Sequence, residues 1–188
     1  MCGNKNIKKL CLGVSLVSIV LASEAQRLEE ITVIGVVPAG SSIDAAKLAY
    51  PIQTASAEDL DNASILSVAD FLRQNFSSVS ANDAQNNPMQ PDIQYRGFTA
   101  SPLLGLAQGL AVYQNGVRIN EPLGDTVNWD LLPQSAIQNL SLGGGPNPLY
   151  GLNSLGGALV IDMKDGFNFE GANLEISAGS FGRTASNF

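Results

Sequence analysis

The chain has 188 residues, which is enough for one domain with a buried core. Its formal net charge is −7, and this acidic balance argues against a nucleic-acid partner. Histidine is absent and Cys2 and Cys11 are the only cysteines, so metal sites and catalytic triads that need histidine are excluded.

The first 25 residues have the features of a signal peptide. Three lysines between Lys5 and Lys9 precede an apolar run of twelve residues, Leu10 to Leu21, and small residues at Ser23 to Ala25 suit a signal peptidase. This run is shorter than the roughly 20 residues of a membrane-spanning helix, so a retained anchor is the weaker alternative. Cleavage before Gln26 leaves 16 of the 17 acidic residues and 7 of the 10 basic ones. It also removes both cysteines, so a packed core must hold the exported chain without disulfides.

The start of the mature chain is expected to be extended. Ile31 to Ile34 are β-formers, with acidic residues before them and Gly35 and Pro38 behind. Two interpretations remain open: an edge strand of this domain, or a free strand that a partner binds by β-augmentation. Residues 39–55 are expected to form a linker that leads into a short strand around Tyr50 to Ile52.

Two helices with serine caps are predicted next. Ser56, followed by acidic residues, marks the start of one helix, and Ser67 can cap a second helix from Val68 to Asn75. Phe71 and Leu72 share one face with Val68, so we expect that face to pack in the core.

Short strands and long loops follow. Residues 77–90 are polar, and a strand from Asp92 is expected to pass through Arg96 and end at Gly97. Asn115-Gly116, between two apolar runs, is the strongest short signal for a hairpin. Loops are expected at residues 99–109 and 121–130.

The stretch from Leu131 to Lys164 combines strands with many glycines. We expect a short helix with Pro133 in its first turn, a strand from Asn139 to Leu142, a glycine-rich loop and a strand from Ala158 to Met163. The whole chain therefore predicts an α+β fold, with a small mixed sheet of about four strands and two or three short helices.

The order of these motifs resembles the plug domain of TonB-dependent outer-membrane receptors and transporters. The motifs are an acidic-apolar box after the signal peptide, FLRQN, IQYRGF, VYQNGVRIN, LLPQSAIQNL and LYGLNSLGGALVI. In that family the plug is enclosed in a β-barrel of ~22 strands. A covering barrel agrees with the charged fraction of 14%, which is below the roughly 25% of ordinary soluble domains.

The resemblance implies a division of the chain and roles for particular residues. Residues 1–25 would be the signal peptide, 26–42 the TonB-box segment and linker, 43–164 the plug, and 165–188 the start of a truncated barrel. The implied TonB box, which binds the TonB C-terminal domain, is Glu30, Ile31, Thr32, Val33 and Ile34. The implied contacts with the barrel of the same receptor are Arg96, Gly97 and Phe98, and the candidates for contact with a ligand are Thr99, Ser101, Gln108, Asn120 and Trp129. An alternative for Arg96 is a solvated arginine at a strand end.

Two positions depart from the family pattern. The usual Leu-Arg-Gly-Pro is replaced by Leu142-Gly143-Gly144-Gly145-Pro146, which puts a second ion pair with the barrel in doubt. The usual Asp-Gly of the hairpin is Asn115-Gly116, which keeps the turn but loses a charge. Only 24 residues follow Lys164, so we expect a gene fragment, a truncated reading frame or a deliberately shortened chain.

Three classes of function differ in how well they agree with these features. The first is the plug and energy-coupling region of a transporter that takes up a scarce ligand, such as an iron chelate including a siderophore, cobalamin or a glycan, in the outer membrane of a Gram-negative bacterium. The second is a free-standing binding domain in the periplasm, where the fragment would lie if expressed alone. The third is an enzyme, which we do not expect: no Gly-Lys-Ser/Thr follows Gly143 to Gly145, and Asp59, Asp61, Asp125 and Asp130 read as solvated acids. No cofactor or metal is expected.

Overall fold

The computed structural model describes residues 33–35, 42–44 and 50–187, except residues 64, 66, 84, 85, 89, 168, 173 and 183. The predicted signal peptide and Glu30, Ile31 and Thr32 of the predicted TonB box lie outside the described residues. Within the described part, no helix has the length and apolarity to cross a bilayer.

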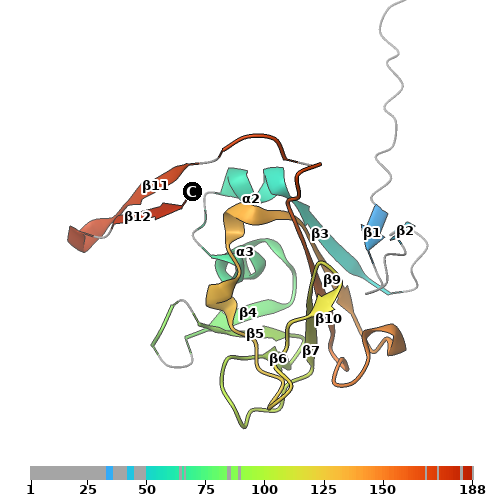
Figure 1. Cartoon of the computed structure of the whole chain (residues 1–188). Helices are drawn as coiled ribbons and strands as arrows, with labels where there is room; N and C mark the ends of the chain where they lie inside the picture. Colours follow the sequence, from blue (N-terminus) through green and yellow to red (C-terminus); the bar gives the residue numbers. More distant parts are fainter. Residues whose placement is uncertain are drawn as a thin grey trace, which may run out of the picture. The chain divides into compact units, whose positions relative to one another are not determined.

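A five-stranded sheet forms the centre of the domain (Figure 1). Its order is β3 (Ile52–Ser56), β9 (Ile137–Gly144), β10 (Gly157–Met163), β7 (Leu110–Gln114) and β8 (Val117–Arg118). β10 is antiparallel to β9 and parallel to β7, so the sheet is mixed, as the sequence predicted. Asn115 and Gly116 turn the β7–β8 hairpin with φ values of 48° and 77°, which confirms the predicted hairpin.

The two predicted helices are present with their predicted caps. Ser56 precedes α2 (Ala57–Ala63), and its hydroxyl accepts a hydrogen bond from the Asp59 backbone N–H at 3.3 Å. The Asp59 carboxylate in turn accepts from the Ser56 N–H and from the Ser56 hydroxyl, each at 2.8 Å, and these two hydrogen bonds to the carboxylate hold the pKa of Asp59 below its usual value. Ser67 caps α3 (Val68–Asn75) by accepting from the Asp70 N–H at 3.1 Å.

A second, three-stranded sheet corrects one sequence interpretation. It consists of β4 (Val79–Asn82), β5 (Asp92–Tyr95) and β6 (Phe98–Ala100), all antiparallel. The predicted strand through Arg96 instead ends at Tyr95, and Arg96 and Gly97 form a two-residue turn with φ values of 52° and 86°. The expected loop from Thr99 therefore begins two residues later, because Thr99 pairs with Gln94 in this hairpin.

The stretch from Leu131 to Lys164 also differs in detail from the prediction. The expected helix is a 3-10 turn, η3 (Gln134–Ala136), which Pro133 precedes, and a similar turn, η2 (Trp129–Leu131), lies before it. β9 has eight residues and includes Gly143 and Gly144, which were expected in the loop. A third 3-10 turn, η4 (Pro148–Tyr150), lies in the remaining loop.

Five further short elements lie toward the ends of the described chain. β1 (Val33–Gly35), in the segment expected to be extended, pairs with β2 (Ser42–Asp44), in the stretch expected to be linker. β11 (Glu175–Ala178) pairs with β12 (Thr184–Asn187) around the turn η5 (Ser180–Gly182). Among the described residues the fold is thus α+β with two α-helices and a small mixed sheet, which confirms the predicted class.

The central sheet has two differently covered faces, which we call the helix face and the tyrosine face. Figure 1 shows α2 and α3 on one side of β3, β9 and β10, and residues of α3 form one core cluster with Leu140, Leu159 and Ile161. On the tyrosine face a smaller cluster contains Ala111, Tyr113, Tyr150, Ala158 and Val160. Residues alternate between the two faces along β10, as the period of a strand requires.

Candidate functional site

Three loops meet at one end of the central sheet. They are residues 101–109 between β6 and β7, residues 119–128 after β8, and residues 145–156 between β9 and β10. Backbone hydrogen bonds tie them together: the Gly156 N–H donates to the Gly109 carbonyl at 2.8 Å, and the Val127 N–H donates to the Ser101 carbonyl at 2.9 Å. The loops therefore form one connected surface.

Phe98 fixes two of these loops at their bases. A Cβ atom added to Gly109 would lie 2.7 Å from a ring carbon of Phe98, and one added to Gly156 would lie 2.3 Å from the Phe98 Cβ. Both distances are shorter than real Cβ contacts, so these positions need glycine because the aromatic side chain occupies the space. Phe98 is 37% exposed, and its side chain lies against Gly109 and Gly156, the residues just before β7 and β10.

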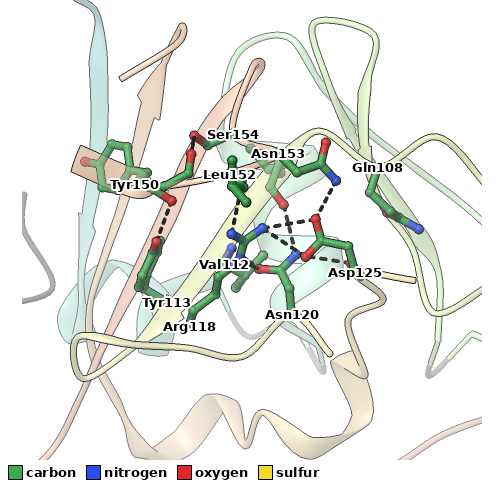
Figure 2. Close-up of polar contacts among 12 residues, drawn as sticks. Gln108, Val112, Tyr113, Arg118, Asn120, Asp125, Tyr150, Leu152, Asn153 and Ser154 are labelled. Atoms are coloured by element: carbon green, nitrogen blue, oxygen red, sulfur yellow. Dashed lines mark hydrogen bonds and ion pairs between the residues drawn. The ribbon is translucent and has the colours of Figure 1, made fainter. Parts of the chain in front are cut away.

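A network of polar side chains around Arg118 joins the loop after β8 and the loop between β9 and β10 to strands β7 and β8 (Figure 2). The Nη2 atom of Arg118 donates to both carboxylate oxygens of Asp125, at 2.9 and 3.0 Å. Its Nη1 donates to the Leu152 carbonyl at 2.6 Å, and its Nε donates to Asn120 Oδ1 at 3.3 Å. The Asn153 amide also donates to Asp125. All three nitrogens of this guanidinium are therefore used inside the chain.

Asn120 is a buried support of this network. Its Oδ1 accepts from the Val112 N–H at 2.7 Å, and its Nδ2 donates to the carbonyls of Leu110 and Asp125, each at 3.2 Å. The side chain thus fastens the loop after β8 to strand β7. Since a buried polar group without a partner is costly, this full set of bonds indicates a structural role.

A pocket of about 800 Å³ lies beside the network. It is lined by Leu106, Ala107, Gln108, Arg118, Asn120, Glu121, Pro122, Gly124, Asp125, Leu152 and Asn153. All three loop regions contribute to this lining. No group of three acidic, histidine or cysteine side chains is placed to hold a metal ion among the described residues.

The five residues predicted to contact a ligand fall into two groups. Ser101, Asn120 and Trp129 are buried; Ser101 bonds to Asp92, and the indole N–H of Trp129 donates to the Ala100 carbonyl at 3.2 Å. Thr99, in β6, and Gln108 are partly exposed. Of the five, only Gln108 and Asn120 line the pocket. Contact of these residues with a ligand stays a prediction.

The other predicted site residues lie elsewhere in the domain. The exposed guanidinium of Arg96 lies 5.1 Å from the centre of the Tyr95 ring, next to Gly97 in the turn. Val33 and Ile34 of the predicted TonB box lie in β1, opposite Asp44 and Ile43 of β2.

Sequence reasoning missed Arg118, Asp125 and Asn153. A signal for Arg118 was available, because the Asn115-Gly116 turn places it opposite Tyr113 on the tyrosine face. Its partner Asp125 lies seven residues along the chain, and Asn153, which donates to Asp125, lies a further 28 residues on, so no local pattern links them.

The tyrosine face is held by neutral hydroxyl groups. The Tyr113 hydroxyl donates to the Tyr150 carbonyl at 2.7 Å, and the two rings lie 5.8 Å apart. Burial raises the pKa of both Tyr113 and Tyr150 above the ordinary value of 10.0, so both remain protonated near neutral pH. The Tyr113 hydroxyl therefore acts as a donor, and both tyrosines pack on this face.

The fold and the loop surface define a plug-like domain of mixed sheet and capped helices. Residues 44–158 match the family model described as the TonB-dependent receptor plug domain. Because the match spans more than half of the chain, the chain belongs to this family, whose members are outer-membrane receptors. Its homologues are transport receptors rather than enzymes.

Several solved structures share this fold. The FpvA receptor of P. aeruginosa, solved with a heterologous pyoverdine and iron, is 13% identical, with a TM-score of 0.61, and the match covers 82% of this chain and 19% of that one. The FpvAI–pyocin S2 complex is 14% identical, with a TM-score of 0.60 over 82% of this chain and 18% of that one. BauA, the ferric preacinetobactin receptor of Acinetobacter baumannii, is 14% identical, with a TM-score of 0.51 over 71% of this chain and 18% of that one. This chain spans less than a fifth of each receptor, and a search of curated protein sequences finds no match.

Proposed function

We propose that this chain is the plug and energy-coupling region of a TonB-dependent outer-membrane transporter for a scarce ligand, such as an iron chelate, cobalamin or a glycan. This proposal rests mainly on the match of residues 44–158 to the plug-domain family. The loop surface and its pocket support a role in ligand contact, because three loops converge there. The chain would not transport alone or catalyse a reaction, and it would act inside the barrel of its own receptor in the outer membrane.

Coupling would pass through the segment Glu30 to Ile34. Among the described residues, β1 and β2 form a sheet of two strands only, so the second edge of β1 pairs with no described strand. An open edge is what β-augmentation by the TonB C-terminal domain requires. Ligand binding at the loops would shift the population in which this segment is available, provided that the ligand binds the two states with different affinity.

Contact with the barrel would involve Arg96 and the tyrosine face. Arg96 is exposed at the tip of the β5–β6 hairpin, where a carboxylate of a surrounding wall could reach it. On the tyrosine face, Thr54 and Asn139 are exposed although they lie on strands of the central sheet. A surface of this kind suits a second, covering structure.

The test is binding of the full chain, and of a peptide spanning residues 27–37, to a TonB C-terminal domain, measured by isothermal titration calorimetry. The unmodified peptide should bind, and Val33→Pro should abolish binding because proline removes a backbone donor from the pairing strand. Val37→Pro is the matched control outside the box and should keep most of the affinity. No measurable affinity of the unmodified peptide, or equal loss in both variants, would contradict the proposal.

A further inference from the structure

We propose that the loop pocket takes a small cationic ligand with an apolar surface, and that it discriminates against anionic chelates. This inference rests on the proposed function, because it assigns a ligand class to the surface where a transported molecule would dock. The evidence is the charge, the hydrogen bonding and the apolar lining of the pocket.

The positive charge of the pocket is already neutralised. Arg118 is the only cation among the described residues that line it, and its side chain is 26% exposed. Its three nitrogens are engaged by Asp125, Asn120 and the Leu152 carbonyl, as Figure 2 shows. An anionic ligand would have to compete with the Asp125 carboxylate for this guanidinium, and weakening of a partly buried ion pair opposes that exchange.

A negative charge remains after this pairing. Glu121 lines the same pocket and is exposed, and its Oε1 accepts a hydrogen bond from Asn128 Nδ2 at 2.5 Å. A neutral amide does not cancel the charge of the carboxylate. The lining therefore carries one positive and two negative side chains, Arg118 against Glu121 and Asp125, or a net charge of −1.

The sequences of the loops also favour a net negative charge at the pocket. Residues 101–109, 119–128 and 145–156 contain no lysine or arginine, so the loops bring no further cation to the pocket. An anion in the pocket would meet Glu121 without a free positive partner, whereas a cation would be attracted.

The apolar part of the ligand would meet leucines. Leu106 and Leu152 line the pocket and are 43% and 87% exposed. Other exposed leucines lie on the same three loops, namely Leu104, Leu123, Leu149 and Leu155. Leu104 contacts the loop after β8, because a Cβ atom on Gly124 would lie 2.4 Å from its Cδ2. Exposed apolar side chains concentrated on connected loops are typical of a binding surface.

The experiment compares two iron complexes of the same shape and opposite charge. Tris(2,2′-bipyridine)iron(II) is a dication with apolar rings, and its analogue with carboxylate groups on each bipyridine is an anion. Equilibrium dialysis against the full chain at low salt, with iron measured on both sides, should show binding of the dication and none of the anion. Dication binding should weaken as salt is added, because ions screen Glu121.

Variants separate the charge from the apolar contact. Glu121→Gln should weaken dication binding about threefold at low salt, as expected for one exposed charge. Glu58→Gln, the same change at an exposed position of α2, should leave it unchanged. Leu152→Ala should weaken it at all salt concentrations. Near-ultraviolet circular dichroism of the buried Trp129 checks that each variant is folded.

Three results would overturn the ligand class. They are binding of the anion as tight as that of the dication, binding of neither complex, and equal effects of Glu121→Gln and Glu58→Gln. If the segment spanning residues 27–37 still binds the TonB domain in that case, the proposed function stands and only the ligand class fails. The converse pattern, dication binding without TonB binding, overturns the coupling role and leaves the pocket assignment.

Discussion

The two faces of the central sheet are made by the same strands but are stabilised differently. On the helix face, Leu140 and Ile161 are fully buried under α3, and residues of β5 such as Tyr95 extend the same cluster. On the tyrosine face, Tyr113 and Tyr150 cover small residues next to them, while Asn139 is exposed. The cluster on the helix face is much the larger of the two.

The difference shows which part of the domain can stand alone. The helix face already buries large aliphatic side chains within the domain. The free energy gained by this burial is proportional to the apolar area removed from water, so this face needs no further covering. The tyrosine face depends on a loop that carries Tyr150 and on a few hydroxyl contacts. We therefore expect the helix face to supply most of the stability of the isolated domain, and the tyrosine face to respond to a covering partner.

The largest expected effect comes from a matched pair of substitutions on neighbouring strands. Val112 lies on the helix face with 0% exposure, and Val160 lies on the tyrosine face with 6% exposure. Val112→Ala should reduce the free energy of unfolding by about 3 kcal/mol, because it deletes buried methyl groups and leaves a cavity. Val160→Ala should cost about half as much or less, because the smaller cluster can relax around it.

Urea unfolding followed by circular dichroism measures both variants. The midpoint should fall further for Val112→Ala, with the same slope for both, since a changed slope would report an altered unfolded state. Equal losses would mean that the tyrosine face is as firmly packed as the helix face, and the comparison would fail.

A contact between the two sheets gives the next largest effect. Phe98 of β6 packs on Gly156 just before β10, so Gly156→Ala would place a methyl group where the Phe98 Cβ lies. Overpacking of this kind should cost about 2 kcal/mol. In the double variant with Phe98→Ala the space is free, so the two losses should not add. Additive losses in thermal unfolding would show that Phe98 does not restrict Gly156.

The sequence predicted local features well because their causes are local. The Ser67 cap and the Asn115-Gly116 turn depend on residues within a few positions, and both are present. The turn at Arg96-Gly97 was missed, because arginine with φ of 52° is unusual and no pattern favours it. Local sequence patterns therefore predict common caps and turns more readily than unusual backbone conformations.

Longer-range structure could not be read from the sequence. Gly143 and Gly144 were expected in a loop but are the last two residues of β9. A tyrosine lies close to each glycine. A Cβ added to Gly143 would lie 3.1 Å from a ring carbon of Tyr50, and one added to Gly144 would lie 2.5 Å from the Tyr95 hydroxyl. The parallel pairing of β10 with β7 and the Arg118 network also join distant segments. Such contacts depend on the packed fold, which a pattern of neighbouring residues does not encode.

Ionisation of Asp162 should have a smaller effect on stability than the packing changes. Asp162 lies in β10 on the tyrosine face, and burial raises its pKa above the ordinary 3.8. The folded state then holds this proton more tightly than the unfolded state, so the contribution of Asp162 to stability is fully present below pH 3.8 and is lost as the pH rises through its folded pKa. Above that pH the full cost of a half-buried carboxylate remains.

Asp162→Asn removes this ionisation and should therefore stabilise the domain at pH 7. The gain in free energy of unfolding should be smaller than the loss from either packing change. The stability at acid pH should be nearly unchanged. Asp61→Asn, at an exposed position of α2, is the control and should have no such pH-dependent effect. Thermal unfolding of the three proteins between acid and neutral pH measures the difference. If Asp162→Asn stabilises equally at both ends of the range, the gain comes from hydrogen bonding. If Asp162→Asn does not stabilise the domain at pH 7, solvent already reaches this carboxylate. The tyrosine face would then be more accessible to solvent than the burial of Asp162 indicates.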